Sequence, residues 1–138
     1  MISHSTDIRV RYADTDAMTF VYHGNYLIYF EQSRTEMLRA AGLSYAEIER
    51  MGLFIVVIEA HVRYHQPARY DDLLHVKATM NERPNLRFRI DYEISKESVD
   101  QLLITGYTVH TFINKTTQRP VRPPKEFMGT IQKYFEIP

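Results

Sequence analysis

The spacing of apolar and polar positions changes several times along the chain, and each change predicts an element. Residues 7–12 alternate, with Ile8, Val10 and Tyr12 on one side, which indicates a strand with one buried face. Residues 25–41 show helical spacing instead, beginning at an Asn25 cap and ending at Gly42. Because the apolar residues of this helix cover more than one side, we expect it to be enclosed.

A short second helix and four more strands are predicted after the long helix. Ser44 and Glu47 have the spacing of a capping box, so a helix ending near Met51 is expected. Period-two alternation then predicts strands at residues 58–65, 74–80 and 86–94. Residues 102–114 are apolar on both sides, which favours a central or interface strand. The breaks at 67–72, 82–85 and 96–100 are short enough for antiparallel hairpins, and the prolines of 120–124 precede a short terminal helix.

The order of strand, long helix and four strands indicates the fold class. One helix against an antiparallel sheet of about five strands is an α+β architecture. A length of 138 residues suits a single domain, residues 1–138, with its own core. The second face of the sheet is polar on three strands and apolar on the last, so we expect another subunit to cover part of it.

Composition and charge exclude several classes of protein. Lysine plus arginine total 17, as do aspartate plus glutamate, and this balance argues against a nucleic-acid or membrane-surface binder. The absence of cysteine excludes disulfides, thiolate metal sites and cysteine nucleophiles. The N-terminus lacks the pattern of a signal peptide, and the longest apolar run, residues 53–58, is too short to span a membrane. We therefore expect a cytoplasmic protein without membrane insertion.

The candidate chemistry lies between the first strand and the long helix. Residues 12–26, YADTDAMTFVYHGNY, carry Asp14, Asp16 and His23 toward the start of that helix. Free N–H groups at a helix start bind oxyanions, and a carboxylate facing them across an acyl group makes a workable hydrolase site. By spacing alone, an Asp-x-Asp pair is more often a turn or cap, and a lone histidine there is more often structural. The residues alone thus leave the function open.

A resemblance to a known family changes this balance. Residues 11–42, RYADTDAMTFVYHGNYLIYFEQSRTEMLRAAG, resemble the signature of the 4-hydroxybenzoyl-CoA thioesterase family, which has the hot-dog fold, and especially its branch associated with the Tol–Pal system of bacteria. The shared pattern is an aromatic residue, Asp-x-Asp, Val-Tyr-His, Asn-Tyr opening the helix, and Glu-x-x-Arg within it. Residues 64–72, YHQPARYDD, are similar to the family's Pro-Ala segment. The resemblance covers nearly the whole chain and implies an acyl-CoA thioesterase.

The resemblance also implies roles for individual residues. Asp16 becomes the catalytic carboxylate, as nucleophile or as general base. The N–H groups of about His23 and Gly24 would polarise the thioester oxygen, and losing one such donor typically costs about 2.7–4 kcal/mol. His23 itself either orients water or the carboxylate or is purely structural. Tyr22 and Asn25, in the same segment, are expected to contact substrate.

Coenzyme A is expected as part of the substrate, and the resemblance implies no separate cofactor and no metal. Its phosphates require arginines, which bind phosphate with paired hydrogen bonds. We expect the nucleotide near the hairpin at residues 83–87. The candidate arginines are Arg63, Arg83 and Arg87, followed by Arg69 and Arg89, with a solvated face of mixed charge as the alternative for each.

Some positions carry narrower expectations. Family members usually have glycine where this chain has Thr19, and threonine restricts the backbone where glycine takes a positive φ. Asp14 is expected to cap the turn. Glu31 and Arg34 are expected to pair on the helix, with the alternative that the glutamate borders the pocket.

Similar proteins assemble as dimers whose sheets join edge to edge, often paired again into tetramers, with the active site between subunits. We therefore expect a homodimer, and a homotetramer built from it. The alternative to a thioesterase is a non-catalytic module that binds acyl-CoA or acyl carrier protein, which would have no need of Asp16. A hot-dog dehydratase is disfavoured, because the segment around His23 does not resemble that branch. The acyl group and its carrier, coenzyme A or acyl carrier protein, remain open.

Overall fold

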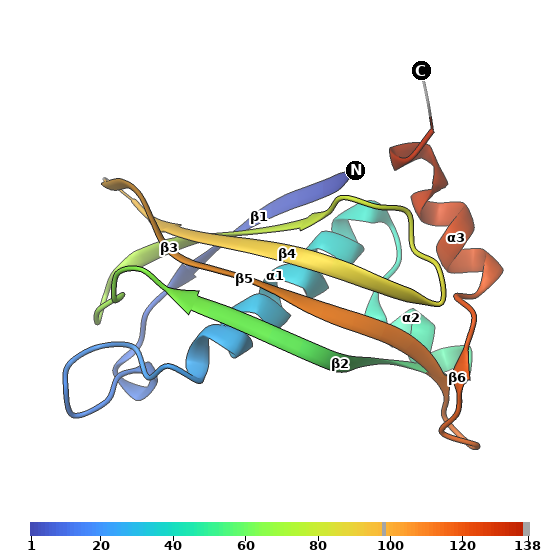
Figure 1. Cartoon of the computed structure of the whole chain (residues 1–138), viewed down its shortest axis with the longest axis horizontal. Coiled ribbons are helices and arrows are strands. Elements are labelled where there is room, and N and C mark those ends of the chain that lie inside the picture. Colours follow the sequence, from blue (N-terminus) through green and yellow to red (C-terminus); the bar gives the residue numbers. More distant parts are fainter. Residues whose placement is uncertain (98, 137–138) are drawn as a thin grey trace.

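One antiparallel sheet packs against one long helix in the computed structural model, which describes residues 1–97 and 99–136 (Figure 1). The strands run in the order β1-β3-β4-β5-β2, and a short sixth strand pairs with β5. The fold class is therefore as predicted, with six strands in place of about five. The strands are β1 (Ile2–Arg9), β2 (Leu53–Tyr64), β3 (Leu73–Met80), β4 (Arg87–Lys96), β5 (Val99–Asn114) and β6 (Pro120–Val121).

The long helix α1 (Asn25–Ala41) ends as predicted but begins differently. Gly42 closes it in the left-handed region, at φ 110°, which glycine adopts without a Cβ clash. The cap at the start is Gly24, and the expectation of an Asn25 cap is wrong. The reason is that the Asn25 side chain turns back to donate to the Asp14 carbonyl, at 2.8 Å.

In the single chain, only one side of α1 is buried. Tyr26, Phe30 and Met37 are among the buried residues that face the sheet. Leu27 and Ile28 remain 40% and 57% exposed, so the prediction of a fully enclosed helix is wrong for that side. Leu27 and Ile28 thus leave apolar surface uncovered on this side of the helix.

The first strand begins earlier than its alternation indicated. β1 starts at Ile2 and pairs with β3 from Ile2 opposite Met80 to Arg9 opposite Leu73. Tyr12 is not part of it, because residues Tyr12–Asp14 form a 3-10 turn, η1. Tyr12 is 74% exposed and stacks on Tyr70, with ring centroids 3.8 Å apart.

Alternation along β3 and β4 placed the inner face correctly. Every second residue of β3 and β4 is buried: Leu74, Val76, Ala78 and Met80, then Phe88, Ile90, Tyr92 and Ile94. The Phe30 ring of α1 stacks on Tyr92 with centroids 4.1 Å apart. This contact holds the middle of α1 directly on the sheet.

The pairing of β2 differs from the prediction. β2 forms an edge of the sheet and pairs with β5, while β3 pairs with β1 and β4, so the hairpin expected at residues 67–72 is wrong. β5 is an interior strand, as its two apolar faces predicted, and pairs with β4 along one edge and with β2 along the other. The hairpins between β3 and β4 and between β4 and β5 are as predicted. In the second of these, residue 98 lies outside the described residues.

Two short helices complete the fold. Ser44 caps α2 (Tyr45–Arg50), where its Oγ accepts from the Glu47 N–H at 3.3 Å, as the capping box predicted. The terminal helix α3 (Lys125–Ile131) follows the proline-rich break, also as predicted, and is followed by a 3-10 turn, η2 (Gln132–Tyr134). Figure 1 shows α3 at the opposite end of the molecule from the loop that precedes α1.

Candidate active site

Asp14 organises the loop between β1 and α1. Its buried carboxylate accepts hydrogen bonds from the Arg11 N–H (3.1 Å), the Arg11 guanidinium (3.0 Å) and the Tyr29 hydroxyl (2.9 Å). Burial opposes ionisation of Asp14, but the hydrogen bonds from Arg11 and Tyr29 outweigh it and lower the carboxyl pKa. Its backbone oxygen accepts from Tyr22 N–H and from the Asn25 amide. Asp14 thus has the structural role that the sequence predicted.

Asp16 lies two residues further on, in a tight loop that leaves it half-buried. Its N–H donates to the Phe20 carbonyl at 2.9 Å, and its Oδ1 accepts from the Met18 N–H at 2.9 Å. Its own carbonyl accepts from the Thr19 N–H at 3.0 Å. Among the described residues, its second carboxylate oxygen, Oδ2, has no hydrogen-bond donor. The loop therefore holds the carboxylate by one oxygen and leaves the other available.

Thr19 closes this loop in the left-handed region, at φ 69°. A β-branched residue is strained there, at a cost of about 1–3 kcal/mol. The sequence comparison of threonine with the usual glycine therefore identified a position that needs a positive φ.

A cavity of about 370 Å³ brings Asp16 and His23 together. Tyr26 from α1 and Tyr64 from β2 both line it, and the Tyr64 hydroxyl donates to the His23 carbonyl at 3.1 Å. The full lining is Asp16, Phe20, Val21, His23, Tyr26, Tyr64, His65, Gln66 and Pro67. Sequence reasoning did not assign the wall made by residues 64–67, although the family-like segment 64–72 contained it. The wall is recognisable only once the end of β2 is known to pass the start of α1.

The start of α1 presents backbone donors beside this cavity. Asn25 N–H is already bonded to the Tyr22 carbonyl at 2.8 Å. Within the described part of the chain, the N–H groups of His23 and Gly24 donate no hydrogen bond. Tyr22 is 47% exposed, packs against Gly24 and His23, and does not line the cavity.

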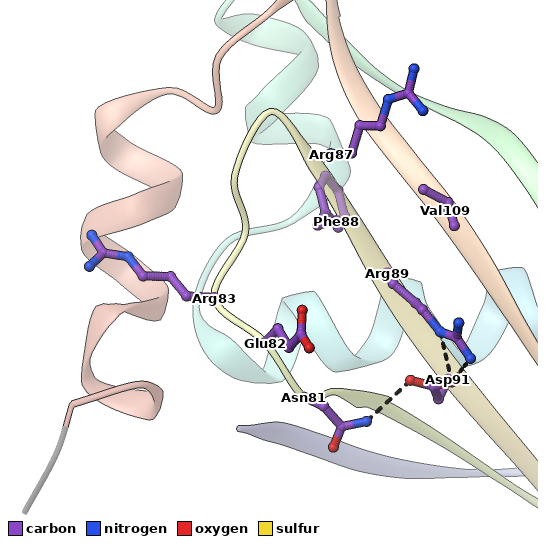
Figure 2. Close-up of a pocket in the computed structure, with 8 residues that line it drawn as sticks. All are labelled: Asn81, Glu82, Arg83, Arg87, Phe88, Arg89, Asp91 and Val109. Carbon is purple, nitrogen blue, oxygen red and sulfur yellow. Dashed lines mark hydrogen bonds and ion pairs between the residues drawn. The ribbon is translucent and has the colours of Figure 1, made fainter.

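Four of the five predicted phosphate-binding arginines lie away from this cavity, and the fifth, Arg69, contacts Thr19 of the Asp16 loop. Arg83 and Arg87 line a hollow of about 470 Å³ at the hairpin between β3 and β4, where Figure 2 shows their side chains pointing in different directions. Arg89, in the same hollow, is paired with Asp91 at 2.9 Å. Arg63 lines a different hollow, over β2, β4 and β5. Arg83 and Arg87 thus line one hollow without converging and Arg63 lines another, and none of the three lines the cavity of Asp16.

The distance between these sites follows from the strand register. Arg87 pairs with Thr111, which also pairs with Val56, whereas Tyr64 pairs with Ile104. From Val56 to Tyr64 is eight residues of β2, or roughly 25 Å along the strand. Arg83 and Arg87 therefore lie near the far end of the sheet from Asp16 of the same chain.

The expected pair of Glu31 and Arg34 does not form among the described residues, and that prediction is wrong. Arg34 turns inward because Tyr92 offers a buried hydroxyl, 3.5 Å from its Nη1. Glu31 instead borders two hollows beside α1, and neither of them contains Asp16, so the alternative that it borders the active-site pocket is not met either. Tyr92 continues the buried polar chain through Thr108 to His110, and burial together with the charge of Arg34 lowers the His110 pKa to about 3.

Residues 1–97 and 99–136 contain neither a cluster of metal-binding side chains nor a membrane-spanning helix. No three histidine, aspartate or glutamate side chains in this part gather as a metal site. None of its helices combines the length and the apolar character needed to cross a membrane.

Comparisons with known proteins agree with this architecture. A family model described as the thioesterase-like superfamily matches residues 10–131. A putative esterase of Aquifex aeolicus is 37% identical over 124 residues, covering 90% of this chain and 94% of that protein. The acyl-CoA thioesterase YbgC of Haemophilus influenzae is 32% identical over 124 residues, covering 88% and 89%. A DHNA-CoA thioesterase from Staphylococcus aureus superposes with a TM-score of 0.84 at 34% identity, covering 98% of this chain and 85% of that one. The hot-dog fold expected from the resemblance is thereby confirmed, and the chain belongs to the thioesterase-like superfamily.

Proposed function

We propose that this protein is an acyl-CoA thioesterase in which Asp16 acts as nucleophile or general base. The observation that supports this most directly is the cavity that Asp16 shares with His23 at the start of α1. Two of the relatives are named for hydrolysis of a CoA thioester. We further assign the chain to the 4-hydroxybenzoyl-CoA thioesterase family and its Tol–Pal branch, on the Val-Tyr-His and Asn-Tyr motifs.

The unpaired N–H groups of His23 and Gly24 would polarise the thioester carbonyl. A helix start favours negative charge, so these donors stabilise the oxyanion that forms when the carbonyl is attacked. In one route, Asp16 Oδ2 attacks the carbonyl carbon, the C–S bond breaks to release CoA thiolate, and water then hydrolyses the acyl-aspartyl anhydride. In the other, Asp16 takes a proton from a water that attacks directly.

Phosphate binding by Arg83 and Arg87 requires a second subunit in this proposal. Their hairpin lies roughly 25 Å from the Tyr64 end of β2, measured along the strand. Antiparallel pairing of two β2 edges would place the Leu53 end of one subunit beside the Tyr64 end of the other. The hairpin of the partner would then approach the cavity of Asp16.

The exposed edge of the sheet supports this dimer. β2 is an edge strand of 12 residues, and a long open edge favours pairing with another chain. Val57 and Ile58 on β2, and Leu27 and Ile28 on α1, are each at least 40% exposed. Leu27, Ile28 and Val57 line one hollow, so these three form a contiguous candidate interface, with Ile58 next to Val57 in the strand.

Sedimentation measurements test the dimer. A chain of 16.3 kDa should sediment as a dimer or tetramer, and Val57→Glu should shift it toward monomer because a buried unpaired charge is costly at an interface. Wild-type protein that is monomeric and fully active would contradict the shared site.

Thiol release from short, long and aromatic acyl-CoAs tests the activity. Asp16→Asn keeps an oxygen for the Met18 N–H but removes the charge, so turnover should fall by at least roughly tenfold. The matched control is Asp7→Asn, which removes an exposed carboxylate that pairs with His75 on the other face of the sheet. Equal activity of Asp16→Asn and wild type would remove the mechanism. Tight binding of acyl-CoA without turnover would favour the binding module.

A further inference from the structure

Arg69 reaches the Asp16 loop from the segment that connects β2 to β3. Its backbone forms a bridge with Phe20, and its Nη1 donates to the Thr19 hydroxyl at 3.3 Å. Its guanidinium carbon lies 4.6 Å from the centre of the Phe20 ring. Arg69 thus contacts two consecutive residues of the loop through three different interactions.

The segment that carries Arg69 is itself anchored. The Arg69 N–H donates to the Asp72 carboxylate at 2.9 Å, and that carboxylate lies 3.8 Å from the Lys96 ammonium. Ala68, the preceding residue, is fully buried and accepts a hydrogen bond from the Val21 N–H at 2.9 Å. Arg69 therefore extends from a fixed support, and it can restrain the loop that it touches.

The loop depends on the strained conformation of Thr19. With φ at 69°, the Thr19 N–H points to the Asp16 carbonyl, and the chain then returns so that Phe20 accepts from Asp16 N–H. If Thr19 relaxed to a negative φ, this reversal would be lost, and with it the placement of the Asp16 carboxylate. Glycine would adopt the same φ without strain but would offer no hydroxyl to Arg69.

We propose that Arg69 is a positioning residue, which holds Thr19 in the left-handed region and thereby holds the Asp16 carboxylate in its cavity. The inference rests on the proposed role of Asp16. It also assigns Phe20, which lines the same cavity, as a wall fixed by the guanidinium. The competing interpretation of Arg69 is a contact to the phosphates of coenzyme A, which would weaken substrate binding when lost but would not depend on Thr19.

A double-mutant cycle separates the two roles. The variants are Arg69→Met, Thr19→Gly and their combination, and the measured quantities are kcat and KM. Methionine keeps an apolar contact with Phe20 and removes the guanidinium. Arg119→Met is the matched control, because Arg119 is an exposed arginine beyond β5 that is remote in sequence from the loop.

In the Thr19 background, Arg69→Met should lower kcat by roughly tenfold and change KM by less than about twofold, because a displaced catalytic group slows the chemical step. In the Thr19→Gly background, the same substitution should lower kcat by less than about threefold, because glycine no longer needs the restraint. An equal fall in both backgrounds, an unchanged kcat, or a rise in KM alone would overturn the proposal.

Amide hydrogen exchange tests the restraint without reference to catalysis. The Met18 and Thr19 amides, both bonded to Asp16, should exchange at least about fivefold faster in Arg69→Met than in wild type or in the Arg119→Met control. The double variant should return toward the exchange rates of Thr19→Gly alone. Unchanged exchange in Arg69→Met would refute the positioning role even if Asp16 proves catalytic, and faster exchange would uphold the restraint even if no acyl-CoA is hydrolysed.

Discussion

Gly106 of β5 lies against the Phe30 ring of α1, and its replacement by alanine tests that contact. A Cβ added at Gly106 would lie 2.4 Å from the His61 carbonyl oxygen of β2, and 2.7 and 2.9 Å from two ring atoms of Phe30. The Phe30 ring has no exposed surface and is stacked on Tyr92, so it has little space to retreat. The His61 oxygen belongs to the backbone of a paired strand and moves only if the strand moves.

The expected cost follows from these contacts. Overpacking a filled core typically costs 1–3 kcal/mol, and a clash with backbone as well as with an immobile ring places Gly106→Ala at the upper end, about 3 kcal/mol. For a chain of this size, that corresponds to a fall in Tm of about 10 °C.

Urea unfolding at a fixed protein concentration measures this effect, because the midpoint of an oligomer depends on concentration. The matched control is Gly129→Ala in α3, where an added Cβ meets no atom within 4 Å. Alanine is the better helix former, so the control should be stabilised by up to about 1 kcal/mol. If Gly106→Ala lay within about 0.5 kcal/mol of wild type, Phe30 and β5 would not be in contact as described.

Two further predictions concern the buried polar groups. The His110 pKa is lowered to about 3 in the folded state, below its unfolded value of about 6.5. Between these two pH values only the unfolded state binds the proton, so the free energy of unfolding decreases as the pH is lowered. From pH 7 to pH 5 this group should remove about 2 kcal/mol from the free energy of unfolding, and unfolding of His110→Gln at both pH values should lack that loss, whereas the exposed control His61→Gln should keep it. Asp14→Ala should cost about 3 kcal/mol in urea unfolding at pH 7, because it leaves the Tyr29 hydroxyl buried without its acceptor, and a cost below that of Asp16→Ala would contradict the structural role. Because the Asp14 pKa is lowered in the folded state, the ionised carboxylate stabilises the fold above about pH 4, and this stabilisation is lost as the pH falls through the folded pKa.

Local sequence patterns predicted the elements whose spacing of apolar residues does not depend on which strand or helix they pack against. The buried faces of β3 and β4 could be read from alternation, because successive side chains of a strand point to opposite sides whatever the strand pairs with. Gly42 and Ser44 likewise marked helix boundaries correctly, since capping involves only residues within one turn. The resemblance of residues 11–42 added the family, and Thr19 was singled out because family members usually have glycine there.

The sequence by itself determined the order of the long helix and the main strands and which faces of β3 and β4 are apolar, because those properties depend on neighbours a few residues away; the bounds of β1 and β2 it did not determine. Only the tertiary structure decided that β2 pairs with β5, that Tyr64 passes the start of α1, and that Arg34 turns to Tyr92 and not to Glu31. It also decided that Arg69 reaches the Asp16 loop, and that Arg83 and Arg87 lie far from Asp16 of their own chain. Each of these contacts joins residues remote in the sequence or depends on which buried partner is available, and such choices are made by the packing of the whole chain.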